Sequence, residues 1–118
     1  MLLGLHTGTI MHTNLMTDIR VAQETGYDAI EFYIPKLVRY LDAGYRVEEL
    51  RPVLGSLKVA MIDSFLHIER QDPEARRDLR ESCERLCQVA QILTTAPGPL
   101  ASIITCSVLP LFSSMRTK

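Results

Sequence analysis

Three short apolar runs, separated by segments with helical periodicity, constrain the fold of this chain more than any other feature. The runs occupy residues 2–6, 27–33 and 58–62. Each has the length and the apolar character of a buried strand, and each is followed by polar or turn-forming residues. Strands that alternate with helices pair in parallel through right-handed crossovers, so the sequence predicts an α/β fold.

The segments between these runs carry helix start and stop signals. Thr13 and Asn14 are good N-cap residues and Gly26 supplies a left-handed stop, which together predict a first helix. Two shorter helical pieces follow the second run, over residues 36–42 and 47–54. The expected order of elements therefore begins β-α-β-α-β.

A longer amphipathic helix follows the third run. Asp72 and Pro73 announce its start, because the acid caps the helix and proline suits its first position. We interpret Cys83 and Cys87 as packing residues of this helix, because two helical thiols without further ligands make a poor zinc site. Its apolar stripe consists of Ala75, Leu79, Cys83, Leu86, Ala90 and Leu93.

The charged residues are balanced in number but unevenly distributed. Fourteen acidic and thirteen basic residues leave a net charge of −1, so we expect neither nucleic acid nor a membrane as a partner. All acidic residues lie at or before Glu84, and residues 86–115 carry no charge. We therefore divide the chain into residues 1–93 and an atypical Ser/Thr/Pro-containing tail, residues 94–118, with room for one further strand at 101–106. Three cysteines without a C-x-x-C spacing fit a reducing cytoplasm.

Two architectures accommodate this order of elements, an open doubly wound sheet and part of a closed barrel. The loop after the first run, residues 6–9, has too few glycines for the common phosphate-binding loops. A nucleotide-binding sheet is thereby disfavoured, but the pattern of elements alone leaves both architectures open.

Specific residues carry a family resemblance. They are the opening Leu3-Gly4-Leu5-His6, the segment from Ala22 to Glu31, and residues 50–60. The middle segment has the form A-x-x-x-G-[YF]-D-x-[IV]-E, with its glutamate near the end of the second strand. Over about residues 2–93 the chain resembles the N-terminal portion of the xylose-isomerase-like TIM barrels, which include sugar (phosphate) isomerases and epimerases. The resemblance implies a partial (β/α)8 TIM barrel of about three to four β/α units with parallel strands.

The resemblance also implies a chemistry. Complete members of the isomerase and epimerase branches use a divalent metal (Mn, Mg, Co or Zn), held by residues of strands five to eight, and paired carboxylates that move a proton between adjacent carbons. A complete barrel takes ~250 residues. We therefore expect this chain to be a fragment or truncated form that holds no catalytic residue and binds no metal alone.

Three residues are candidates for binding a small sugar or polyol, because active sites of such barrels lie where the strands end. They are His6, Glu31 and His67. Each has a blander alternative: His6 as a loop histidine that caps nearby backbone, Glu31 as the ion-pair partner of Lys36 or Arg39, and His67 as a solvated loop residue. Nearby tyrosines, at positions 33, 40 and 45, either stack on a sugar ring or pack on one another.

Two further functional interpretations stand beside the isomerase-like enzyme. The chain is alternatively a non-catalytic half-barrel module that binds a partner or forms a homo-oligomer, because an exposed sheet edge invites association. A small independent α/β binding domain with an open sheet is the third interpretation.

Overall fold

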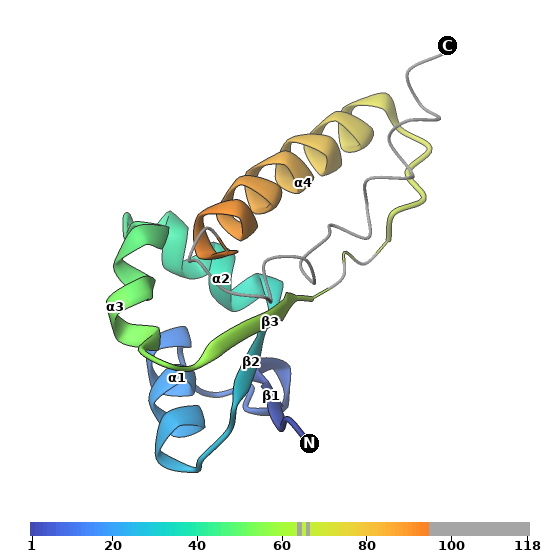
Figure 1. Cartoon of the computed structure of the whole chain (residues 1–118). Coiled ribbons are helices and arrows are strands. Elements are labelled where there is room, and N and C mark those ends of the chain that lie inside the picture. The colour runs from blue at the N-terminus through green and yellow to red at the C-terminus, as the bar shows by residue number, and fades with distance from the viewer. Residues whose placement is uncertain (64, 66, 95–118) are drawn as a thin grey trace. The chain divides into compact units, whose positions relative to one another are not determined.

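The computed structural model describes residues 1–63, 65 and 67–94. The chain divides into two compact units, Met1–Leu66 and the residues from His67 onward, and each unit is described by itself. The first unit contains β1 (Gly4–His6), the 3-10 helix η1 (Thr7–Thr9), α1 (Leu15–Glu24), β2 (Ala29–Phe32), α2 (Ile34–Asp42), the 3-10 helix η2 (Val47–Glu49), α3 (Leu50–Leu54) and β3 (Lys58–Ile62), coloured blue to green in Figure 1. The second unit contains α4 (Pro73–Thr94).

The three strands of the first unit form a parallel sheet in the order β1-β2-β3. The parallel α/β arrangement that the apolar runs predict is confirmed. Leu5 pairs with Ile30, which pairs with Val59, so these side chains share one face of the sheet. Helix α1 contacts β2 and α2. The fully buried apolar residues of this unit form its core and are Ile19, Ala22, Ile30, Phe32, Leu37 and Leu50.

The helices begin largely where the sequence predicts them. Asn14 caps α1 by accepting a hydrogen bond from the Thr17 N–H at 2.9 Å, and Gly26 ends the turn with φ of 80°. Helix α2 begins at Ile34 rather than at residue 36, because Pro35 fits the first turn of a helix. The piece expected over residues 47–54 is divided into η2 and α3.

A β-bulge interrupts the pairing of β2 with β3. Ile30 pairs with Val59 and Glu31 pairs with Met61, so Ala60 is an extra residue in β3. Because side chains alternate between the two faces of a strand, one extra residue turns all later side chains to the other face. Met61 therefore shares a face with Glu31. Asp63, two residues further on, lies on that face as well.

A buried ion pair connects α1 with α2. Lys36 Nζ lies 2.6 Å from Asp18 Oδ2, and the two residues are 5% and 0% exposed. The ammonium group also donates to the Ile10 carbonyl at 2.5 Å and to Thr13 Oγ1 at 3.3 Å. Thr13 in turn donates to Asp18. The ammonium group, the carboxylate, the Thr13 hydroxyl and the Ile10 carbonyl thus satisfy one another's hydrogen-bonding capacity. These bonds offset the cost of removing both charges from water.

Tyr40 connects α2 with η2. Its hydroxyl donates to the Arg46 carbonyl at 3.3 Å, and its ring stacks on Tyr45 with 5.0 Å between centroids. Burial, and then the nearby Glu49 carboxylate, raise the pKa of Tyr40 above its ordinary value of 10.0. Both effects disfavour the phenolate.

The second unit is described through α4. Asp72 caps this helix by accepting a hydrogen bond from the Ala75 N–H at 2.8 Å, and Pro73 is the first helical residue, as predicted. Its apolar stripe is buried over its C-terminal half, including Cys83, Leu86 and Leu93. Nearly all of the tail that we separated from residue 94 on, and the further strand at 101–106, fall outside the described residues. No helix in the described part of the chain is long and apolar enough to cross a membrane.

We predict that Lys36→Met lowers the free energy of unfolding of the 118-residue chain by about 3–5 kcal/mol, because it leaves the Asp18 carboxylate buried without its cation. Urea unfolding measures the loss. Adding Asp18→Leu returns part of it, since no buried charge then remains unpaired. Arg46→Met, which breaks the exposed Arg46–Glu48 pair, is the control and costs at most about 1 kcal/mol. Equal losses for Lys36→Met and Arg46→Met would contradict the prediction.

A second prediction concerns Tyr40. In a phenolate absorbance titration, the tyrosine that Tyr40→Phe removes is one that ionises above pH 10.0. Because the folded-state pKa is the higher one, Tyr40 contributes stability below its unfolded pKa that is lost as pH rises through the folded pKa. Glu49→Gln lowers the pKa of Tyr40 part of the way, whereas the neighbouring Glu48→Gln leaves it nearly unchanged. If the tyrosine that Tyr40→Phe removes from the titration has an ordinary pKa, the raised pKa of Tyr40 is refuted.

Candidate functional site

Three polar side chains meet at the carboxyl ends of the parallel strands. His6 is the last residue of β1, Glu31 is the third residue of β2, and Asp63 directly follows β3. His6 and Glu31 are partners in the register of β1 with β2, so they lie side by side on one face. The carboxyl edge of a parallel sheet is where ligands bind in α/β folds.

The histidine lies between the two carboxylates. His6 Nε2 is 3.6 Å from Glu31 Oε1 and 3.7 Å from Asp63 Oδ2, and one ligand-type atom from each residue lies within 4.8 Å of the others. The side chains are 36%, 24% and 25% exposed, so a solute can reach them. Both distances exceed that of a direct hydrogen bond, so the three side chains are placed to bind a further polar group between them.

The backbone of the following turn fixes the His6 ring. The Gly8 N–H donates to His6 Nδ1 at 3.0 Å, and Thr9 Oγ1 donates to the His6 carbonyl at 2.7 Å. The ring of Tyr33 lies against it in a tilted contact, 6.4 Å between centroids. The buried Thr7 accepts a hydrogen bond from the Tyr33 N–H at 2.7 Å. His6 therefore caps backbone, as its blander alternative proposes, and faces two carboxylates as well.

Gly8 is required for this geometry on steric grounds. A Cβ atom at position 8 would lie 2.4 Å from His6 Cε1 and 2.8 Å from His6 Nδ1. Real Cβ atoms do not approach other heavy atoms so closely, so any other residue would displace the ring or the turn. From the sequence, Gly8 indicated only a loop, although a glycine two residues after a strand-end histidine is the signal for this contact.

Asp63 is the site residue that the sequence analysis missed. Its N–H donates to the Phe32 carbonyl at 2.9 Å, which continues the β2–β3 pairing one residue past β3. That bond fixes the backbone from which the carboxylate reaches the His6 ring. The available signal was its position as the first polar residue after an apolar run.

The other expectations have different outcomes. Lys36 pairs with Asp18, so Lys36 is not the ion-pair partner of Glu31, and the alternative with Arg39 stays a prediction. His67 is exposed, adopts φ of 55° and begins the second unit. In the part of the chain that the structure describes, the group of His, Asp and Glu ligand atoms contains His6 and Glu31 but not His67. The substrate-binding roles of all three stay predictions.

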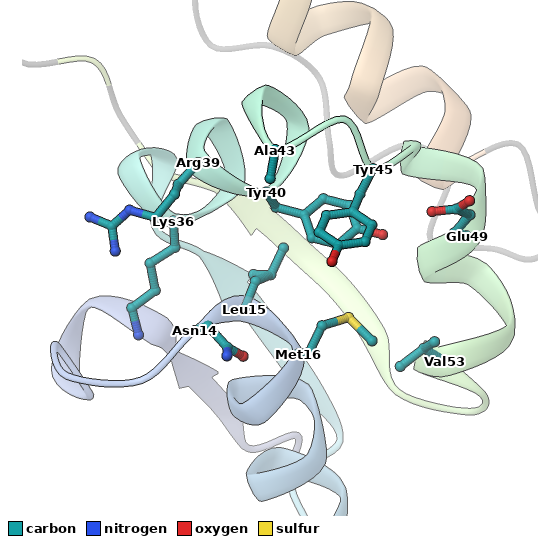
Figure 2. A pocket seen from close by; sticks show the side chains of 10 residues that line it. All are labelled: Asn14, Leu15, Met16, Lys36, Arg39, Tyr40, Ala43, Tyr45, Glu49 and Val53. Carbon is teal, nitrogen blue, oxygen red and sulfur yellow. The ribbon is translucent and has the colours of Figure 1, made fainter.

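A cavity of about 490 Å³ lies beside α1, α2 and α3, and none of the three clustered residues lines it (Figure 2). Tyr40 and Tyr45 lie over one another in its wall, so these two tyrosines pack on each other. The side chains of Lys36 and Arg39 lie at one end of this wall and Glu49 and Val53 at the other. Its lining consists of Asn14, Leu15, Met16, Lys36, Arg39, Tyr40, Ala43, Tyr45, Glu49 and Val53.

The cluster matches a divalent-metal site in its donor types but not in its histidine tautomer. A neutral imidazole has one N–H and one lone pair. The Nδ1 lone pair accepts the Gly8 N–H, so the proton is on Nε2, the nitrogen that faces the carboxylates. A metal-binding histidine has the reverse arrangement, with the lone pair on the metal and the other nitrogen donating outward. The three residues as arranged do not fit a metal ion.

No protein-family model and no curated protein matches the chain. Among solved structures, the chain is similar to the IolI protein, whose 1.8 Å crystal structure has a bound zinc atom. The TM-score is 0.68 at 20% sequence identity. The similarity covers 79% of this chain and 34% of IolI, so the chain spans about a third of that protein's length.

IolI is a TIM barrel, and this chain shares its fold over about a third of that protein's length. The identity is too low to carry a substrate or a reaction from one protein to the other. The fold is nevertheless established: this chain has the parallel α/β architecture of a portion of a TIM barrel.

Proposed function

We propose that the chain supplies a substrate-binding edge of a sugar isomerase- or epimerase-like barrel, where His6, Glu31 and Asp63 bind hydroxyl groups of a sugar or polyol. The observation that carries the proposal is the meeting of these three side chains at the carboxyl ends of the strands. The similarity to IolI supports the class of barrel.

The chemistry of the cluster suits a polyhydroxylated ligand. A hydroxyl group both donates and accepts, whereas a carboxylate only accepts and an N–H only donates. A hydroxyl that bridges His6 and a carboxylate therefore satisfies both sides of the 3.6 and 3.7 Å separations. Tyr33 lies beside His6 and offers an aromatic face for the carbon side of a sugar ring.

The three residues bind and orient the substrate in this proposal, and no bond-making step is assigned to them. Correct placement of a substrate is itself a large part of catalysis. A metal such as the zinc of IolI is proposed to be held by other residues of an assembled barrel, and substrate binding by His67 stays a prediction.

The proposal predicts where a neutral sugar contacts the chain. In a ¹H–¹⁵N NMR titration of the 118-residue chain with D-fructose, the largest shift changes are expected at the backbone amides of His6, Gly8, Glu31 and Asp63. His6→Ala abolishes these changes, because it removes the N–H donor at the centre of the cluster.

The control is His12→Ala, which removes an exposed histidine outside the cluster and leaves the sugar-induced changes intact. Changes centred on the cavity residues Tyr45 and Val53, or changes that survive His6→Ala, would place the binding site elsewhere.

A second candidate function, the half-barrel module that self-associates, is favoured by the exposure of β3. Strand β3 is an edge of the three-stranded sheet, and Lys58, Ala60 and Met61 are exposed although the strand is mostly apolar. Met61 is 48% exposed. An edge strand of this kind pairs readily with another chain.

This alternative predicts a concentration-dependent dimer in size-exclusion chromatography with light scattering. Met61→Lys shifts the chain toward the monomer, because a charge on an edge strand disfavours association. Met11→Lys, at another exposed methionine outside the sheet, is the matched control and leaves the mass unchanged. A monomer at every concentration excludes the alternative.

A further inference from the structure

We infer that the backbone N–H of Gly8 locks His6 as an Nε2–H donor, so that the cluster recognises a neutral hydroxyl group directly and not through a bound metal. The inference rests on the proposed function and deepens it in two respects. It names the chemistry of the ligand, and it identifies Gly8 as a positioning residue that acts through His6.

The lock follows from the hydrogen bond between the turn and the ring. Gly8 N–H lies 3.0 Å from His6 Nδ1 and donates to it. Moving the imidazole proton to Nδ1 would place two N–H groups opposite each other and lose this bond. The backbone of η1 therefore determines which ring nitrogen is the donor. His6 Nε2 presents its N–H to the side of the cluster where Glu31 and Asp63 lie.

The same turn fixes the position of the ring. Gly8 comes so close to the imidazole that a Cβ atom would overlap it, at 2.4 Å from Cε1. Its third neighbour, Tyr33 Cδ2 at 3.5 Å, is at an ordinary contact distance. Gly8 has no left-handed φ, so the cost of a side chain there comes from the contact with His6.

The arrangement selects among ligands by charge and by hydrogen bonding. The Nε2–H group donates a hydrogen bond to a hydroxyl oxygen, and the same hydroxyl donates one to the carboxylate of Glu31 or Asp63. An anionic phosphate oxygen would face two carboxylates at short range and be repelled. A divalent cation would meet the proton of Nε2 instead of a lone pair. The cluster thus favours an uncharged polyol or the hydroxyl-bearing end of a sugar.

The first part of the test measures the tautomer in the full chain. Long-range ¹H–¹⁵N NMR spectra of the histidine rings at neutral pH are expected to show His6 with the proton on Nε2. Addition of one equivalent of Zn²⁺ is expected to leave the ring nitrogens of His6 unchanged. A proton on Nδ1, or a zinc-dependent change of Nε2, overturns the inference even if the sugar binds.

The second part tests Gly8. Gly8→Ala is expected to weaken D-fructose binding about three- to tenfold, the size of one lost hydrogen bond, and to abolish the tautomer preference of His6. Gly4→Ala is the matched control, because a Cβ there meets Ala29 at an ordinary 3.9 Å. The contact with the His6 ring is also expected to make Gly8→Ala lower the free energy of unfolding. In a His6→Ala background the ring is absent, so Gly8→Ala then lowers that free energy no further. A full additive loss contradicts the role of Gly8.

Conservative replacements of His6 separate a donor from a metal ligand. Glutamine is a poor substitute for a metal-binding histidine, but its amide N–H group reaches near the position of Nε2. His6→Gln is therefore expected to retain part of the sugar affinity. His6→Asn, whose amide reaches only as far as Nδ1, is expected to lose it. Equal loss in both variants overturns the donor role.

The failure of the inference and the failure of the proposed function are distinguishable. If the tautomer is Nε2–H but D-fructose causes no shift changes at all, the hydroxyl recognition and the proposed function fail together. Only the statement that Gly8 places the His6 proton on Nε2 then stands. If D-fructose binds at the cluster but the proton is on Nδ1, the proposed function stands and the lock is overturned.

Discussion

The position of the candidate site depends on the buried ion pair of Lys36 with Asp18. The pair joins α1 to α2, and Lys36 also holds the carbonyl of Ile10, which directly follows the η1 turn. The turn that carries Gly8 is therefore fixed at both ends, by β1 before it and by this lysine after it. A charged pair costs desolvation, and here each partner has additional hydrogen bonds that offset the cost. Such a pair tolerates little displacement, which suits a turn that must hold an imidazole ring in one orientation.

The β-bulge at Ala60 decides which residues can join His6 and Glu31. Without the extra residue, Asp63 would lie on the opposite face of the sheet, with the buried side chains of Ile30 and Phe32. A carboxylate on that face would be buried among apolar groups, which is costly. With the bulge, the same residue lies on the polar, accessible face. The third member of the cluster is therefore a consequence of backbone pairing and not of the local sequence.

The sequence predicts the elements of this fold well, because their signals are local. Apolar runs, the Asn14 cap and the Gly26 stop each act within a few residues of the structure that they specify. His6 and Glu31 could be placed at strand ends for the same reason. The partner of Lys36 could not be identified, since several carboxylates were within reach and only tertiary packing chooses Asp18. The bulge that brings in Asp63 was equally invisible, because nothing in residues 58–62 marks one residue as extra.

The role of His6 as a backbone cap determines its role as a ligand-facing residue. An imidazole that used its Nδ1 lone pair elsewhere would have to release the Gly8 N–H, and a backbone donor that loses its acceptor carries a free-energy cost. Because the cap consumes the lone pair, the face toward Glu31 and Asp63 is left with a donor. Local turn chemistry thus sets the kind of ligand that a strand end can accept. A strand-end histidine followed by Gly two residues later differs in this respect from one whose ring is free to turn, even when both face the same carboxylates.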